Sequence, residues 1–162
     1  MAIAIGDRLP DATFRCMGAD GPEEVTTSDL CSGKTVVLFA VPGAYTPTCS
    51  SAHVPSFLRV EDQLGSKGID EIVCLSVNDV FVMQSWAAAT GTDKSGIKML
   101  ADPDGAFTAA IGMDFSAPPV GLIGRSKRYS MVVKDGTVTH LNEEASPGEC
   151  EISAGETLLG QL

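Results

Sequence analysis

The sequence predicts an α/β fold in which a mixed central sheet is flanked by helices on both faces. Apolar β-branched segments alternate along the chain with segments whose apolar residues recur at helical spacing, and a hairpin pattern follows near the C-terminal end. Alternating strands and helices build parallel sheets with helices on their faces, whereas a hairpin adds antiparallel strands. A length of 162 residues is ordinary for one domain, so we expect a single domain over residues 1–162.

The first predicted elements are strands. Residues 12–17 predict a short strand, and the turn-rich residues 18–22 follow it. Residues 35–41 are β-branched and apolar throughout, which is typical of a strand that is buried on both faces. We therefore expect residues 35–41 in the middle of the sheet.

A helix is expected from about residue 47 to residue 64. Thr46 is its expected N-cap, and Pro47 is its first helical residue, where a missing N–H has no cost. Pro55 lies inside this segment and cannot donate a backbone hydrogen bond to the carbonyl group of Ser51. We therefore expect the helix to kink at Pro55.

The second half of the chain continues the alternation and then changes to a hairpin. Asp135-Gly136 is the strongest hairpin signal, because this pair suits a type I′ turn. The expected elements are strands over 71–77 and 97–100, helices over 79–90 and 105–111, hairpin strands over 128–133 and 137–141, and a last helix over 153–162. This order suits a thioredoxin-like core with an N-terminal extension.

The charge of the chain argues against two classes of partner. With 11 basic and 21 acidic residues, its net charge is -10. Such a surface repels phosphate backbones and anionic lipids, so we expect binding neither to nucleic acid nor to a membrane. The N-terminal residues lack the pattern of a signal peptide, and no run approaches the roughly 18 apolar residues of a membrane helix. These features predict a cytoplasmic protein.

Five cysteines are spread along the chain. Their odd number, wide spacing and lack of a Cys-x-x-Cys pair argue against a secreted disulfide scaffold, a zinc ribbon and a thioredoxin-type redox pair. Cys16 and Cys31 have no supporting motif, and we treat them as structural. The candidates for redox chemistry are Cys49, Cys74 and Cys150.

Cys49 has the strongest local signal for reactivity. It falls at the third helical position, where free backbone N–H groups and the helix dipole favour an anion. For a cysteine that anion is the thiolate, which is the nucleophilic form. Thr46, one helical turn earlier, can hydrogen-bond both the sulfur and a substrate, and Pro42 can cover the pocket with a surface that offers no donor. The segment therefore predicts an activated cysteine.

Two other kinds of site fit the sequence less well. Cys49 and His53 are four residues apart on the predicted helix, a spacing that can hold a metal, but His140 is the only other histidine. We therefore expect no metal site, and we expect His53 to pack beside the pocket. A cysteine hydrolase would need a histidine base with an orienting Asn or Asp, which the sequence does not identify.

The segment around Cys49 also matches a family signature. Pro42-x-x-x-Thr46-x-x-Cys49 matches the peroxiredoxin pattern Pro-x-x-x-Thr-x-x-Cys, and residues 41–50 resemble the type II, or peroxiredoxin-five, subfamily. Further matching segments are residues 53–57, 76–83 with Trp86, 100–105 and 125–133, so that the resemblance covers essentially the whole chain. It implies a thiol peroxidase that reduces hydrogen peroxide and alkyl hydroperoxides without a metal or organic cofactor.

The resemblance assigns roles to individual residues. Cys49 resembles the peroxidatic cysteine that becomes a sulfenic acid, Thr46 the threonine that orients the peroxide, and Pro42 the proline that shields the sulfur. Arg128 matches the distant active-site arginine of the family. Its permanent charge would stabilise both the thiolate and the charge that builds on the peroxide oxygens. Arg125 in the same segment is the alternative.

The resemblance leaves the reduction of the sulfenic acid open. Cys150 lies in a loop-like segment and Cys74 in a predicted strand, and type II relatives place a second cysteine in each of these regions. A strand interior favours a packed role for Cys74. The third alternative is direct attack by glutathione, glutaredoxin or thioredoxin.

Two other functions remain as alternatives to a peroxidase. The first is a peroxide-sensing redox relay that passes oxidation to a partner protein. The second is a thiol–disulfide oxidoreductase, which the missing Cys-x-x-Cys pair disfavours. The resemblance further implies a homodimer that packs through surfaces near the active-site loop.

Overall fold

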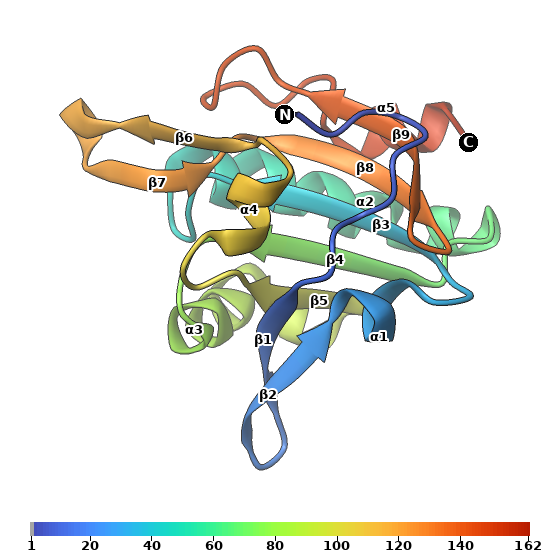
Figure 1. Cartoon of the computed structure of the whole chain (residues 1–162), viewed down its shortest axis with the longest axis horizontal. Helices are drawn as coiled ribbons and strands as arrows, with labels where there is room; N and C mark the ends of the chain where they lie inside the picture. Colours follow the sequence, from blue (N-terminus) through green and yellow to red (C-terminus); the bar gives the residue numbers. More distant parts are fainter. Residues whose placement is uncertain (1) are drawn as a thin grey trace.

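The chain folds around a seven-stranded mixed sheet with the strand order β2-β1-β5-β4-β3-β8-β9 (Figure 1). The computed structural model describes residues 2–162. The strands of the sheet are β1 (Thr13–Gly18), β2 (Gly21–Thr26), β3 (Thr35–Val41), β4 (Glu71–Ser76), β5 (Ile97–Ala101), β8 (Tyr129–Lys134) and β9 (Thr137–Glu143). Two further strands, β6 (Asp114–Ala117) and β7 (Leu122–Ser126), form a separate hairpin.

Helices cover both faces of the sheet. The helices α2 (Val54–Ser66), α3 (Val80–Thr90) and α5 (Gly155–Gly160) contribute Phe57, Trp86 and Leu158 to the core on one face. The short helices α1 (Thr27–Cys31) and α4 (Ala106–Ala110) contribute Leu30 and Phe107 to the core on the other face. Short 3-10 turns lie at Thr92–Lys94 (η2) and Pro118–Val120 (η3). The prediction of a thioredoxin-like α/β fold is confirmed.

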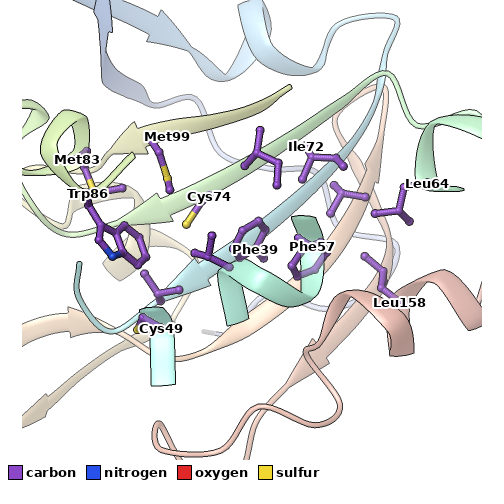
Figure 2. Close-up of a cluster of buried hydrophobic side chains, with 14 of the residues drawn as sticks. Phe39, Cys49, Phe57, Leu64, Ile72, Cys74, Met83, Trp86, Met99 and Leu158 are labelled. Carbon is purple, nitrogen blue, oxygen red and sulfur yellow. The ribbon is translucent and has the colours of Figure 1, made fainter. Parts of the chain in front are cut away.

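Strand β3 lies at the centre of the sheet, as its composition predicts. It runs parallel to β4 and antiparallel to β8. Its side chains alternate between the two cores, with Phe39 in the core under α2 and Leu38 in the opposite core. Figure 2 shows the first of these cores, in which Phe39 and Phe57 stack and Cys49 lies at one end of the cluster.

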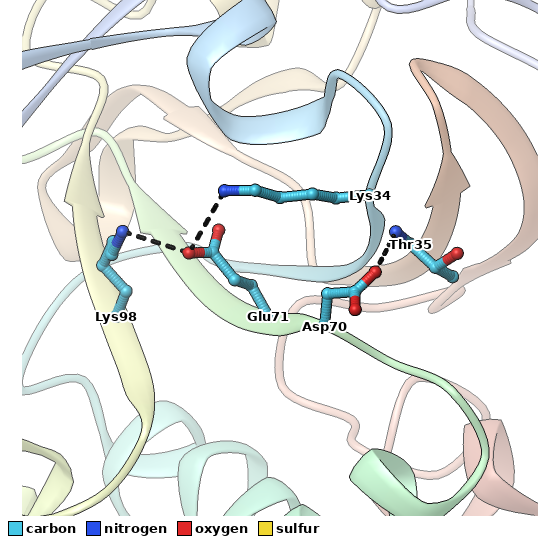
Figure 3. A network of polar contacts seen from close by, with 5 residues as sticks. All are labelled: Lys34, Thr35, Asp70, Glu71 and Lys98. Atoms are coloured by element: carbon cyan, nitrogen blue, oxygen red, sulfur yellow. Dashed lines mark hydrogen bonds and ion pairs between the residues drawn. The ribbon is translucent and has the colours of Figure 1, made fainter.

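Polar contacts fix the start of β3 against β4 (Figure 3). The backbone N–H of Thr35 donates to a carboxylate oxygen of Asp70, and the N–H of Asp70 donates to the carbonyl oxygen of Thr35, both at 2.8 Å. Beside them, one carboxylate oxygen of Glu71 lies 3.7 Å from Nζ of Lys34 and 3.5 Å from Nζ of Lys98. These contacts set the register of the two strands and therefore the position of the chain that leaves the other end of β3.

Three strands and one α-helix of the structure were not predicted from the sequence. Strand β2 is a mostly exposed edge strand that carries polar residues, so it lacks an apolar pattern. Helix α1 has five residues, although the reciprocal capping of Thr26 and Asp29 marks its start. Strands β6 and β7 are largely exposed, and a β-bulge interrupts their pairing. All four lack the apolar periodicity on which the prediction relied.

The helix after β3 begins at Pro47 as predicted, and a wider helical turn directly precedes Pro55. Residues Cys49–His53 form a π-helical turn (η1) that continues into α2. The N–H of Val54 donates to the carbonyl group of Cys49, five residues earlier. Pro55 has no N–H to donate, so a regular helix would leave a backbone carbonyl group of the preceding turn without a donor. A wider turn before Pro55 reduces this loss of hydrogen bonds. The π-turn therefore places Cys49 and His53 at its two ends.

Candidate active site

Cys49 lies in the first turn of the helix that follows β3, and its side chain is fully buried. The loop that leaves β3 contains Tyr45, whose positive φ of 66° reverses the chain before the helix begins. Beneath the turn, Nε1 of Trp86 donates to Oγ of Ser50 at 3.0 Å. The sulfur is therefore held between the end of β3 and α3, at the edge of the core.

Two donors converge on the sulfur of Cys49. Oγ1 of Thr46 lies 2.7 Å from Sγ, and Nη2 of Arg128 lies 3.1 Å from it. The Thr46 hydroxyl is also 2.8 Å from the carbonyl oxygen of Gly43, so its single proton can serve either acceptor. Thr46 precedes the helix, and its hydroxyl faces the sulfur, both as predicted. A pair of donors on one sulfur is an arrangement that stabilises negative charge there.

Arg128 is almost fully buried, and all parts of its guanidinium group are engaged. Besides Nη2 on Cys49, Nη1 lies 2.9 Å from Nδ1 of His53, and Nε donates to the carbonyl oxygen of Pro147 at 3.0 Å. Arg128 directly precedes β8, which pairs with β3, and this pairing brings it beside the end of β3. Arg125 lies elsewhere, with its guanidinium group against Gly43. The structure thus brings Arg128, and not Arg125, to the sulfur.

His53 was expected only to pack beside the pocket, but it also makes two hydrogen bonds. Its ring lies 5.0 Å from that of Phe39 and 5.7 Å from that of Phe57, measured between centroids. Its Nδ1 faces Arg128, and its Nε2 lies 3.0 Å from the carbonyl oxygen of Ser153. Burial, together with the charge of Arg128, lowers the pKa of His53 to about 3. The imidazole is therefore neutral at physiological pH.

An open cavity of about 280 Å³ adjoins the Thr46 and Arg128 side chains. Its walls come from the active-site loop, from the β6–β7 hairpin and from the segment before α5. The lining residues are Pro42, Thr46, Pro47, Thr48, Ala117, Val120, Leu122, Arg128, Pro147 and Gly148. Pro42, Thr46 and Arg128 were identified from the sequence, whereas the apolar residues of the hairpin were not, because β6 and β7 lack the pattern of a buried strand.

Residues 144–153 lie beside the cavity and are linked to its surroundings by hydrogen bonds. The buried carboxylate of Glu144 accepts hydrogen bonds from the backbone N–H groups of Glu151 and Ser153 and from the Ser153 hydroxyl. The hydroxyl of Thr48 donates to the carbonyl oxygen of Gly148 at 3.0 Å. Burial raises the pKa of Glu144, but these hydrogen bonds outweigh it, so the pKa lies below its usual range. The segment is thus tied to both the helix and the arginine.

The two candidate partners of Cys49 differ in their surroundings. Cys74 is fully buried in β4, and burial, together with the neighbouring Cys49, raises its pKa well above the usual value. Cys150 is half-buried in the segment before α5, where burial raises its pKa while Arg128 and Ser153 oppose that rise. All five cysteines are free thiols in the structure.

Two absences can be stated for residues 2–162. No three His, Cys, Asp or Glu side chains in that range are grouped so that they could hold a metal ion. Within the same residues, no helix is both long and apolar enough to cross a membrane.

The chain is similar to proteins of known family. The Redoxin family matches residues 4–159. The chain is 45% identical over 164 residues to peroxiredoxin-2E-2, chloroplastic, from Oryza sativa subsp. japonica, which covers 99% of this chain and 72% of the relative. It is 41% identical over 161 residues to peroxiredoxin-2B from Arabidopsis thaliana, which covers 99% of this chain and 98% of the relative.

A solved structure agrees with these relatives. Reduced Prx3 from Vibrio vulnificus, in complex with hydrogen peroxide, superposes with a TM-score of 0.91 at 45% identity, covering 98% of each chain. The match extends over the sheet, the helices and the loop that carries Cys49, because the coverage is nearly complete. By sequence and by fold, the chain belongs to the Redoxin family and, within it, to the type II peroxiredoxins, which are thiol-dependent peroxidases.

Proposed function

We propose that Cys49 carries out the peroxidase reaction of this family, with Thr46, Pro42 and Arg128 as the other catalytic residues. The observation that carries this proposal is the convergence of Thr46 Oγ1 and Arg128 Nη2 on the Cys49 sulfur. Donors that hold a thiolate are also placed to stabilise the oxygen that leaves the peroxide. Pro42 lines the cavity beside them and adds no competing donor.

The reaction is an in-line displacement. The Cys49 thiolate attacks one peroxide oxygen, so that an S–O bond forms while the O–O bond breaks. The leaving oxygen takes a proton and departs as water or an alcohol, and the cysteine becomes a sulfenic acid. The similar Vibrio vulnificus protein has been solved with hydrogen peroxide, which supports a peroxide as the substrate here. No electron carrier other than the sulfur is needed for this step.

Alkyl hydroperoxides are the second substrate class. Ala117, Val120 and Leu122 form an apolar wall of the cavity that Thr46 and Arg128 also line. A peroxide that approaches these two side chains can place its alkyl group against this wall, where burial of apolar surface is favourable. Hydrogen peroxide has no alkyl group that could contact this apolar wall.

A thiol then condenses with the sulfenic acid to give a disulfide and water, and a second thiol reduces that disulfide and returns Cys49 to the thiol. Thioredoxin, glutaredoxin or glutathione supplies the electrons, either directly or through a resolving cysteine. Cys150 is the better candidate for that role, because it is half-buried in a segment without regular structure, whereas Cys74 is enclosed in the sheet. Mapping of disulfides by non-reducing peptide mass spectrometry after one equivalent of hydrogen peroxide separates Cys150, Cys74 and an external thiol.

The proposed protein is a homodimer in the cytoplasm. Each chain is a single domain over residues 1–162. Several large apolar side chains near the active-site loop are exposed, which supports a subunit interface there: Tyr45, Phe81, Val120 and Ile123. Light scattering of the reduced protein tests the dimer, and cell fractionation tests the location, since two relatives are named chloroplastic.

The decisive experiment compares the wild-type protein with Cys49→Ser. We expect the wild-type protein to consume hydrogen peroxide over many cycles with a thiol reductant, and the variant to consume none. Persistent activity in Cys49→Ser would contradict the proposal. A single oxidation of the wild-type protein without turnover would instead favour a peroxide-sensing relay.

A further inference from the structure

The hydrogen bonds of His53 fix the protonation of its ring. A guanidinium group can only donate, so the contact of 2.9 Å from Nη1 of Arg128 requires an unprotonated Nδ1. A carbonyl oxygen can only accept, so the contact of 3.0 Å with Ser153 requires a proton on Nε2. His53 is therefore a neutral imidazole in the Nε2–H form. In this form it accepts from one neighbour and donates to the other.

We propose that His53 is a positioning residue that holds the Arg128 guanidinium on the Cys49 sulfur. This inference rests on the proposed function, because it concerns the reaction of Cys49. An arginine side chain has several rotatable bonds, and only a fixed guanidinium group stabilises the transition state without a cost of reorganisation. His53 fixes one end of that group through Nη1, while Pro147 fixes Nε, so that Nη2 points to the sulfur.

The position of His53 is itself determined by the segment before α5. The Ser153 carbonyl that accepts from Nε2 belongs to a residue whose N–H and hydroxyl both donate to the buried carboxylate of Glu144. The hydrogen bonds thus run from Glu144 through Ser153 and His53 to Arg128 and the sulfur. Every side chain in this series is buried. Water is therefore excluded as a substitute partner, and the cost of breaking one link is high.

A packing role is the alternative explanation for His53. Its ring contacts the stacked rings of Phe39 and Phe57, whose centroids are 4.1 Å apart. If packing were its whole role, replacement by Phe would be the best tolerated change. If His53 positions Arg128, a small polar residue with an acceptor at the place of Nδ1 would retain more activity than Phe.

Two amide replacements separate these roles. In His53→Asn, the side-chain oxygen lies near the place of Nδ1 and can accept from Arg128. In His53→Gln, the amide reaches the place of Nε2 and leaves Arg128 without its acceptor. We expect the rate constant for oxidation of Cys49 by hydrogen peroxide to fall about 10- to 100-fold in His53→Gln and His53→Phe, and less than about fivefold in His53→Asn. Equal losses in His53→Asn and His53→Gln, or the highest rate in His53→Phe, would overturn the proposal.

A double-mutant cycle tests whether His53 acts through Arg128. In the Arg128→Met background the guanidinium group is gone, so His53→Gln should cause no further loss in the rate of oxidation. A packing role predicts the same fold-loss in both backgrounds, and that result would also overturn the proposal. Near-UV circular dichroism of Trp86, the single tryptophan, shows which variants are folded.

A measurement on the wild-type protein keeps the proposal testable if the variants fail to fold. The chain has two histidines, so a side-chain ¹⁵N spectrum of the wild-type protein and of His140→Gln assigns both rings. We expect His53 to give the pattern of a neutral Nε2–H imidazole at pH 7. An imidazolium or an Nδ1–H form would overturn the proposal. A wild-type protein that consumes no peroxide would contradict the proposed function, whereas this spectrum would still decide the contact between His53 and Arg128.

Discussion

Nε1 of Trp86 donates a hydrogen bond to Oγ of Ser50, the residue that follows Cys49. Trp86 lies on α3 and is fully buried, and it is the only tryptophan of the chain. Its indole ring therefore contacts the π-helical turn that contains Cys49. This contact connects the chemistry of Cys49 to an optical signal.

We expect the fluorescence of Trp86 to change when Cys49 is oxidised. Addition of an oxygen atom to a buried sulfur displaces the turn, and the hydrogen bond of the indole N–H is sensitive to that displacement. Stopped-flow fluorescence after mixing with hydrogen peroxide measures the change and its rate. Cys49→Ser is the control and should show no change. The same signal in Cys49→Ser would mean that Trp86 reports another event.

Replacement of Arg128 by Met should lower the rate constant for oxidation of Cys49 by about 100- to 1,000-fold, the loss typical of removing one donor from a developing charge. The cause is the loss of Nη2 from the sulfur and from the leaving oxygen. Stopped-flow oxidation measures the effect, and Arg15→Met is the matched control, because Arg15 pairs with Glu24 on the surface. An unchanged rate in Arg128→Met would show that the guanidinium group beside the sulfur is not needed for oxidation.

Thr46 offers a comparison between a hydroxyl and a methyl group. Thr46→Ser keeps the donor that lies 2.7 Å from the sulfur, whereas Thr46→Val keeps the shape and removes the donor. We expect kcat/KM for hydrogen peroxide to fall about 100-fold in Thr46→Val and about tenfold in Thr46→Ser. Steady-state kinetics with a thiol reductant measure both. Full activity in Thr46→Val, together with a loss in Thr46→Ser, would show that shape, and not the hydroxyl, is required.

Leu122 should influence the choice between peroxides. Its side chain lines the cavity, so Leu122→Asn replaces apolar surface with an amide. We expect the ratio of kcat/KM for tert-butyl hydroperoxide to that for hydrogen peroxide to fall about tenfold, because a few methyl contacts contribute about 1–3 kcal/mol. Ile5→Asn is the control, since Ile5 is exposed on the N-terminal segment. A ratio that stays constant in Leu122→Asn would argue against an alkyl site on the hairpin.

His53 should make the stability of the fold depend on pH. Its pKa is about 3 in the folded chain, below the ordinary value of 6.5. Between these values the unfolded chain binds a proton that the folded chain does not, so the free energy of unfolding decreases as the pH falls from about 6.5 toward 3, by at most about 1.4 kcal/mol per pH unit.

Urea unfolding of the wild-type protein and of His53→Asn between pH 4.5 and 6.5 measures this dependence. The carboxylates are the same in both proteins, so the difference in slope belongs to His53 and to the groups it contacts. We expect a shallower slope in His53→Asn. Parallel slopes would mean that the imidazole is protonated, or accessible to water, in the folded protein.

The sequence was sufficient for elements whose signal is local. Strand β3 was predicted with its observed bounds because both faces are buried, and the β8–β9 hairpin followed from the Asp135-Gly136 turn, where both residues have a positive φ. The peroxiredoxin motif placed Cys49, Thr46 and Pro42 on one short segment. Local patterns of this kind need no knowledge of the rest of the chain.

The contacts around Arg128 could not be predicted in the same way. His53 and Arg128 are 75 residues apart, and His53 and Ser153 are 100 residues apart. No periodicity connects such residues, because the pairing of β8 with β3 and the path of an irregular segment bring them together. The sequence offered one signal, the spacing of four residues between Cys49 and His53, which was interpreted as packing beside the pocket after a metal site and a hydrolase base were considered.

The order of these residues along the chain has a consequence for protein synthesis. Cys49 leaves the ribosome long before Arg128, and Arg128 leaves it before Ser153 and before Gly155, whose missing side chain lets α5 pack against Ser56. Translation proceeds at about 5–20 residues per second, so the cysteine spends several seconds outside the ribosome without the groups that surround its sulfur. During this interval its reactivity toward peroxide is that of an ordinary thiol. On the proposed mechanism, the enzyme therefore acquires its sensitivity to oxidants only when its fold is nearly complete.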